Sequence, residues 1–74
     1  MKNIPKNITN LTKEEKIILQ ITKENPDGIV RHELCKKAVK ECNLSLSEAW
    51  NEIDLLIKYL FVREHGGIVS YNYN

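Results

Sequence analysis

One stretch of the sequence, residues 44–71, predicts a helix that leads directly into a pair of strands. Ser45 and Glu48 have the spacing of a capping box, so a helix is expected to begin at this point. Apolar residues then recur at helical spacing on one face, and this face is expected to be buried: Leu46, Ala49, Trp50, Ile53, Leu56, Ile57 and Leu60. After this helix, the period changes to the alternation of strands on either side of Gly66 and Gly67, a pair that favours a tight hairpin turn.

Residues 12–30 predict another helix followed by a very short strand. Thr12 and Glu15 form a second capping-box pattern, and the helix behind it has an apolar stripe made of Ile17, Ile18 and Ile21, with Leu11 and Leu19 at its margins. Pro26 disfavours helix in the residue before it, so this helix is expected to end near residue 25. Ile29 and Val30 then form a short apolar segment that we interpret as a strand.

A third helix is predicted over residues 31–41, between the short strand and the turn at Asn43 and Leu44. Its inward row consists of Leu34, Ala38 and Cys42, with Cys35 and Val39 beside it. Its basic residues are expected to face solvent: Arg31, Lys36, Lys37 and Lys40. Because only two glutamates accompany them, this helix is the most basic part of the chain.

Bulk properties predict one small domain. The chain has 74 residues, of which residues 1–10 form a polar segment that we interpret as a flexible tail and residues 11–74 a single domain. A formal charge of +1 says little about partners. No apolar run approaches the about 20 residues that a membrane helix needs, and the first residues lack a signal-peptide core. We therefore expect a cytoplasmic protein with no membrane partner.

The sequence offers little chemistry for catalysis or metal binding. No arrangement of nucleophile and base is suggested by spacing, and there is no glycine-rich phosphate loop. Cys35 and Cys42 lie seven residues apart on one predicted helix, which places them roughly 10 Å apart, too far for a disulfide. His32 and Cys35 share a face, but no second ligand pair accompanies them. We expect no enzyme, no cofactor and no metal site.

The order helix, short strand, helix, turn, helix and hairpin resembles the winged helix-turn-helix proteins, especially small regulators of archaea and their viruses. The positions that carry the resemblance are residues 11–19, 25–29, 33–34, 46–47, 53–56 and 60–62 and the turn at Gly66 and Gly67. The fold class that it implies is mainly α with a β-hairpin: three helices, a short strand that pairs with the hairpin, and a C-terminal two-stranded wing. It also implies binding to duplex DNA, with residues 46–60 in the major groove and the wing at an adjacent groove.

The surface residues support this function unevenly. Ser47, Asn51 and Lys58 suit bases or phosphates, the basic residues of the preceding helix suit phosphates, and the hairpin adds two more, so the DNA-binding candidates are Arg31, Lys36, Lys37, Lys40, Ser47, Asn51, Lys58, Arg63 and His65. Residues 45–60, however, carry one lysine against three carboxylates. Carboxylates in a groove meet phosphate repulsion unless they accept from a cytosine amino group.

The alternative function is a protein-interaction module, an accessory subunit of a replication or transcription complex. Leu55 and Tyr59 are predicted on the solvated face of the last helix, where an apolar pair suggests either a protein contact or contact with thymine methyl groups. The protein-interface candidates are Glu48, Glu52, Leu55 and Tyr59. Many dimeric winged-helix regulators dimerise through an added terminal helix, whereas this sequence ends at the predicted wing. We therefore expect a monomer or a weak homodimer.

Overall fold

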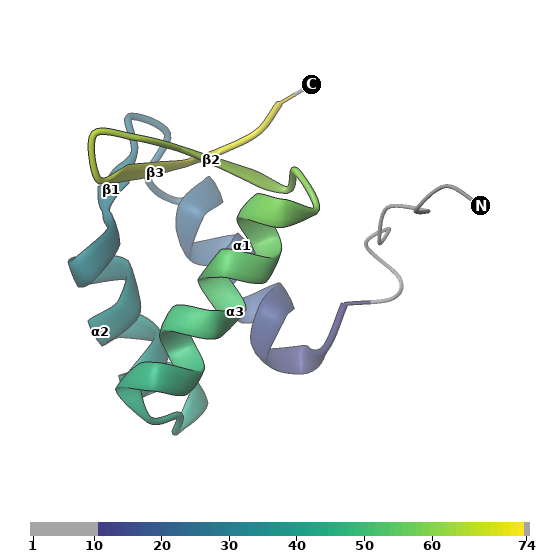
Figure 1. Cartoon of the computed structure of the whole chain (residues 1–74), viewed down its shortest axis with the longest axis vertical. Helices are drawn as coiled ribbons and strands as arrows, with labels where there is room; N and C mark the ends of the chain where they lie inside the picture. The colour runs from purple at the N-terminus through teal and green to yellow at the C-terminus, as the bar shows by residue number, and fades with distance from the viewer. Residues whose placement is uncertain (1–10, 74) are drawn as a thin grey trace.

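A computed structural model describes residues 11–73, and the predicted tail lies outside the described residues. Three helices lie beneath a small sheet (Figure 1). In chain order the elements are α1 (Lys13–Lys23), β1 (Ile29–Val30), α2 (Arg31–Cys42), α3 (Leu46–Lys58), β2 (Val62–His65) and β3 (Ile68–Tyr71). This order, with an antiparallel C-terminal hairpin, is the winged-helix topology, so the predicted fold class is confirmed.

The sheet has the strand order β1-β3-β2, with β3 in the centre and both pairings antiparallel. Ile29 pairs with Val69, which joins the short strand to the hairpin as the resemblance implied. Gly28 makes this pairing possible, because its φ is +96° and a Cβ there would lie 2.5 Å from Ile68 Cγ2. The hairpin turn uses positive φ at both Gly66 and Gly67, as the sequence predicted.

Both predicted capping boxes are present. The Thr12 hydroxyl accepts a hydrogen bond from the Glu15 N–H at 3.1 Å, and the Glu15 carboxylate accepts one from the Thr12 N–H at 2.9 Å. Ser45 and Glu48 make the same reciprocal pair at the start of α3, at 3.1 and 2.8 Å. These bonds satisfy backbone donors that a helix start otherwise leaves without partners.

The end of α3 explains how the chain turns into the wing. Leu60 has φ +67°, its N–H donates to the Ile57 carbonyl at 3.0 Å, and the Phe61 N–H donates to the Leu56 carbonyl at 2.9 Å. This is the Schellman pattern, in which glycine usually occupies the left-handed position. Because Leu60 occupies it here, its side chain turns away from the stripe of α3 and is 68% exposed.

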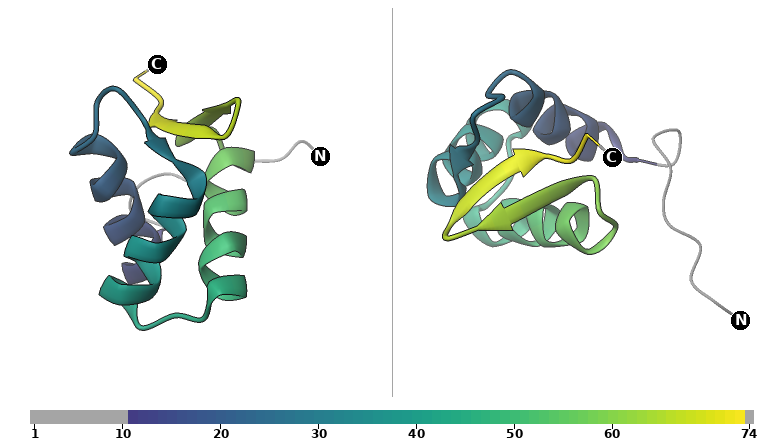
Figure 2. Two further views of the ribbon diagram at one scale, coloured as in Figure 1. Left: turned by 90° about the vertical axis from the view of Figure 1, so that its left-hand side faces the viewer. Right: turned by 90° about the horizontal axis from the view of Figure 1, so that it is seen from above.

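The core lies where the three helices meet the underside of the sheet (Figure 2). Its buried apolar residues are Leu11, Ile18, Leu19, Ile21, Ile29, Leu34, Cys35, Ala38, Ala49, Ile53, Leu56, Val62 and Val69. Leu11 and Leu19, predicted at the margins of α1, are fully part of this core, whereas Ile17 is only half-buried.

The predicted buried face of α3 is too wide. Ala49, Ile53 and Leu56 are buried as expected, but Leu46 is 57% and Trp50 43% exposed. Residues 46 and 50 lie one turn apart at the edge of the stripe that faces α2. Both side chains line an open groove between α2 and α3, so this edge of the stripe is not covered.

Candidate nucleic-acid interface

Arg31, the first residue of α2, was predicted to point into solvent, and that prediction is wrong. The residue is 8% exposed, and Trp50, Asp54 and Glu64 surround its side chain. One Nη atom lies 2.9 Å from Glu64 Oε1, while the other contacts Asp54 Oδ1 and donates to the Trp50 carbonyl at 3.3 Å. The guanidinium carbon also lies 3.9 Å from the centre of the Trp50 ring. We call these four residues the Arg31 junction.

The junction holds three elements together. Arg31 belongs to α2, Asp54 to α3 and Glu64 to β2, and the Arg31 N–H donates to the Gly67 carbonyl at 2.8 Å. Helical periodicity could not place this residue correctly, because its partners come from segments 23 and 33 residues further along the chain. The contact has an electrostatic consequence: two carboxylates next to the outward side of α3 are compensated by a buried cation.

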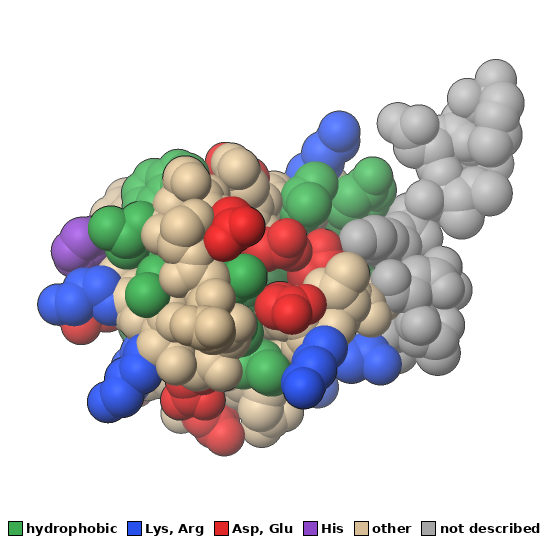
Figure 3. Space-filling model, turned by 90° about the horizontal axis from the view of Figure 1, so that it is seen from below, with side chains coloured by type: hydrophobic (Ala, Val, Ile, Leu, Met, Phe, Trp, Pro, Cys, Tyr) green, Lys and Arg blue, Asp and Glu red, His purple; other side chains and the backbone are tan. Residues whose placement is uncertain are grey.

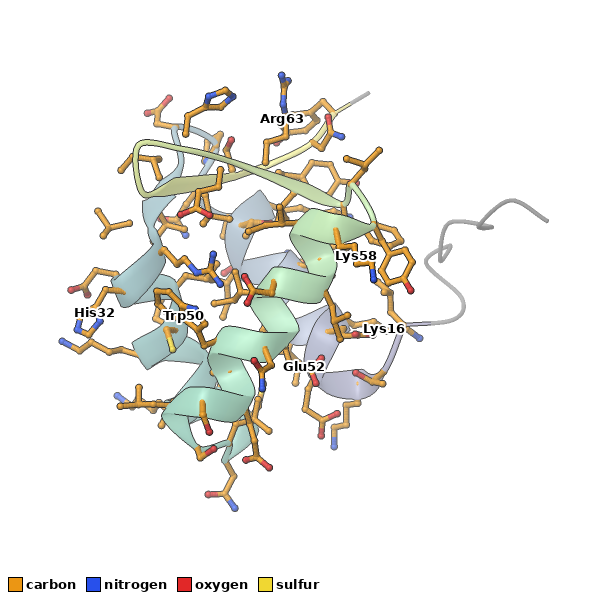
Figure 4. All side chains as sticks on the ribbon, in the orientation of Figure 1. Lys16, His32, Trp50, Glu52, Lys58 and Arg63 are labelled. Atoms are coloured by element: carbon orange, nitrogen blue, oxygen red, sulfur yellow. The ribbon has the colours of Figure 1, made fainter. Side chains whose placement is uncertain are left out.

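Beside this junction, α2 and α3 leave an open groove. It has a volume of about 350 Å³ and is lined by His32, Cys35, Leu46, Ser47, Trp50 and Asn51. The two helices run side by side here, and Trp50 lies on the side of α3 that faces α2 (Figures 2 and 4). The Cys35 thiol closes its floor by approaching the Leu46 carbonyl at 3.5 Å. We call this feature the α2–α3 groove.

Two of the predicted DNA-binding residues line this groove. Ser47 and Asn51 are both exposed and lie one turn apart at the N-terminal half of α3. Lys58 is exposed as well but lies at the other end of the helix, where its ammonium group is 5.9 Å from the centre of the Tyr59 ring (Figure 4). The structure therefore brings Ser47 and Asn51 together and keeps Lys58 apart from them.

The predicted basic residues of α2, apart from Arg31, do face solvent. Lys36, Lys37 and Lys40 are all exposed, and Lys36 approaches the Glu33 carboxylate at 3.9 Å. More than half of each side chain of that pair is exposed, so the pair contributes little to stability and leaves the lysine available to a ligand.

The wing presents its two predicted residues outward. Arg63 and His65 are exposed on β2, and Arg63 points away from the helices (Figure 4). The wing turn lies beside the start of α2, because the Arg31 N–H donates to the Gly67 carbonyl at 2.8 Å, and His65 pairs with Ile68, which in turn pairs with Val30.

The predicted protein-interface residues lie on the opposite flank of α3 from the groove. Glu48 is exposed, but Glu52, Leu55 and Tyr59 are half-buried, so the expectation of a fully solvated apolar pair is wrong. Their flank faces away from α2, on the side where Figure 4 shows Lys16 and Lys58. Acidic side chains gather toward the middle of the end of the molecule below the sheet, with basic ones around its edge (Figure 3).

The ionisable groups of this region show modest perturbations. The hydrogen bond from the Ser45 backbone lowers the pKa of the Glu48 carboxyl. Burial raises the pKa of the Cys35 thiol and of the Cys42 thiol, so both favour the neutral form. Both cysteines are free, and residues 11–73 contain no cluster of three or more histidine, cysteine or acidic residues suited to a metal ion.

The apolar wall of the groove was not predicted. Leu46 and Trp50 were predicted in the core, although the row that they begin continues at the same spacing to Asp54. A row that ends in a carboxylate lies at the border of a buried face rather than at its centre. The spacing of Leu46, Trp50 and Asp54 was therefore the signal in the sequence that could have placed the two apolar residues at the border of the buried face.

No protein-family model, curated protein sequence or solved structure matches this chain. Among the described helices, none is both long and apolar enough to cross a membrane.

Proposed function

We propose that this chain is a DNA-binding protein, a small transcriptional regulator that uses α3 and the wing on duplex DNA. The observation that supports this most is the Arg31 junction. Asp54 and Glu64 would otherwise repel phosphates from the outward side of α3, and both are paired with a buried guanidinium. The polar residues that remain exposed beside the groove, Ser47 and Asn51, are ones that hydrogen-bond base edges.

In this proposal the exposed basic groups of α2 and of the wing have positions on the duplex. The N-terminal half of α3 enters the major groove, because helix-turn-helix proteins read bases with this part of their second helix. Lys36, Lys37 and Lys40 extend from α2 toward the phosphates beside that groove. Arg63 and His65 extend from the wing toward the next groove along the duplex.

The test is a fluorescence-anisotropy titration of the chain with a mixed-sequence duplex at several salt concentrations. We expect binding that weakens with salt, and a slope that falls by about 0.9 for each phosphate contact removed. The double variant Lys36→Ala/Lys37→Ala should lose affinity and reduce this slope. No binding at low salt would overturn the proposal.

A matched control separates a specific contact from net charge. Lys13 and Lys16 are exposed lysines of α1, and Lys16 lies on the far side of α3 from α2 (Figure 4). The double variant Lys13→Ala/Lys16→Ala removes the same charge and should leave the slope unchanged. Equal losses in the two double variants would mean that binding follows net charge alone.

The second candidate function is protein interaction, and the opposite flank of α3 favours it. Glu48 is exposed there beside the half-buried Glu52, Leu55 and Tyr59, which together form a mixed acidic and apolar surface. A partner protein on this flank would be insensitive to the α2 lysines. We expect Glu48→Lys to weaken such an association in a pull-down with replication or transcription subunits, whereas Lys36→Ala/Lys37→Ala leaves it intact.

A further inference from the structure

The α2–α3 groove has an apolar wall that the proposed function does not use. Leu46 and Trp50 are among the large apolar side chains with the greatest exposure in the described part of the chain, and both line this groove. Hydrophobic side chains beside a histidine are visible at the left-hand edge of the molecule in Figure 3. An open apolar wall of this kind marks a contact surface.

We propose that this wall contacts the C5-methyl group of thymine, so that the protein prefers A·T base pairs where the N-terminal half of α3 meets DNA. The inference rests on the proposed function and adds to it a specificity determinant. The residues that carry it are Leu46 and Trp50, neither of which the sequence placed on the surface.

The spacing of the lining residues supports this occupant. Ser47 and Asn51 follow Leu46 and Trp50 directly in the chain, so an apolar row and a polar row run next to each other along α3. An A·T pair presents the same combination in its major groove: adenine offers N6 and N7, which an asparagine side chain can bond, and thymine offers its methyl group. Adjacent apolar and amide side chains are therefore complementary to one edge of that base pair.

The charges around the groove favour DNA over an acidic protein surface. No aspartate or glutamate is among the described residues that line it, and Asp54, one turn beyond Trp50, is paired with Arg31. Lys36 lies one turn beyond His32 on α2 and is exposed, and its contact with Glu33 at 3.9 Å is a weak surface pair that a ligand can replace. A negatively charged ligand with an apolar group fits these surroundings.

The position of Trp50 is set in advance of binding. The Arg31 guanidinium stacks against its ring at 3.9 Å and donates to its carbonyl oxygen. A ring held in this way loses little conformational freedom when a ligand arrives, so the contact can discriminate between bases that differ by one methyl group.

The experiment compares two duplexes, one of alternating dA and dT and one of alternating dA and dU, which differ only in the thymine methyl groups. Because both duplexes repeat a unit of two base pairs, the protein can meet only two registers, and in the thymine duplex each of them presents thymine methyl groups. We expect the protein to bind the thymine duplex about fourfold more tightly for each methyl group that it buries. Leu46→Ser and Trp50→Ala should abolish this ratio while leaving the salt slope unchanged.

Leu60→Ser is the matched control, because Leu60 is an exposed leucine outside the groove. It should retain the preference for thymine. If Trp50→Ala does not fold, Leu46→Ser decides, since that leucine is mostly exposed and lies outside the Arg31 junction.

The remaining outcomes separate the two proposals. Equal binding of both duplexes with a lysine-dependent salt slope would overturn the thymine contact and leave DNA binding in place. Loss of the preference in Leu60→Ser would overturn the assignment to the groove. No binding of either duplex at low salt would overturn the proposed function and this inference together.

Discussion

The contact between α2 and α3 has a different chemistry at the Arg31 junction than at the α2–α3 groove. At the end near the sheet, the Arg31 junction joins the helices and β2 through a buried guanidinium with two carboxylate partners. Further from the sheet, the same two helices leave an open groove whose walls are largely apolar. A buried charged contact and an open apolar surface thus lie within one turn of each other, with Trp50 belonging to both.

This contrast separates residues that hold the domain together from residues that are available to a ligand. Ionic and stacking contacts of Arg31 fix the wing and α3 relative to α2, because they restrain three elements at once. The groove residues are not required to satisfy one another, so their exposed surface is free to pack against something else. Variants at the junction should therefore change stability, and variants in the groove should change binding.

Arg31→Met tests the junction with the largest expected effect. It removes the ion pairs with Asp54 and Glu64 and the stack on Trp50, and we expect the free energy of unfolding to fall by about 3 kcal/mol. The value is at the low end for a buried ion pair because over half of the Asp54 side chain is exposed. Urea denaturation measures it. Arg31→Lys keeps the positive charge but not the planar guanidinium group, so it should lose less stability than Arg31→Met. If Arg31→Met loses only as much stability as the removal of an exposed ion pair, the junction does not hold the domain together.

Gly28→Ala tests the attachment of β1 to the wing. The substitution puts a Cβ at a positive φ and 2.5 Å from Ile68 Cγ2, so we expect a loss of about 2 kcal/mol. Gly66→Ala is a matched control, because Gly66 also has a positive φ but a Cβ added there would meet no other atom within 4 Å. Thermal unfolding of both variants separates backbone strain from the close approach. Equal losses would show that Ile68 moves aside without cost.

Leu60→Gly should raise stability. It relieves the left-handed conformation of a branched residue at the end of α3, for which we expect a gain of about 1 kcal/mol in urea denaturation. Asn43 has φ 56° at the end of α2, and Asn43→Gly should gain much less because asparagine tolerates this region. A loss of stability in Leu60→Gly would mean that the exposed leucine packs against the wing after all.

Leu46→Ser tests the groove side of the comparison. Since 57% of Leu46 is exposed, the change in the free energy of unfolding should stay within about 0.5 kcal/mol. Leu56→Ser, on the buried face of the same helix, should cost several times as much by the same denaturation measurement. Similar losses in the two variants would place Leu46 in the core and remove the groove as a free surface.

The capping box of α3 should have the smallest effect, visible through pH. Because the native pKa of Glu48 is lowered, its carboxylate contributes stability that is present above the pKa of the unfolded chain, about 4.3, and is lost as the pH falls through the native value. Glu48→Gln keeps an acceptor for the Ser45 N–H and cannot titrate. We expect its melting temperature to fall less than that of the unchanged chain between pH 7 and about pH 3. If the melting temperatures of the two proteins fall equally with pH, the Glu48 charge does not contribute this stability.

Local signals were strong enough to predict most of the fold. Capping boxes at Thr12 and Ser45, the break at Pro26 and the turn at Gly66 depend on residues within four positions of one another, so the sequence indicates helix starts and turns directly. The candidate site was harder to predict from the sequence. Ser47 and Asn51 were placed on the surface correctly, but the apolar wall beside them was assigned to the core.

The sequence by itself determined where the helices begin, where the chain turns and that its last strands form a hairpin, because neighbouring residues decide these features. Only the tertiary structure decided that the Arg31 side chain is buried. Its partners, Asp54 and Glu64, lie far along the chain, and a guanidinium is buried only where distant carboxylates converge on it. The tertiary structure also decided that Leu46 and Trp50 are exposed, because a helix stripe does not specify which neighbour will cover each of its edges.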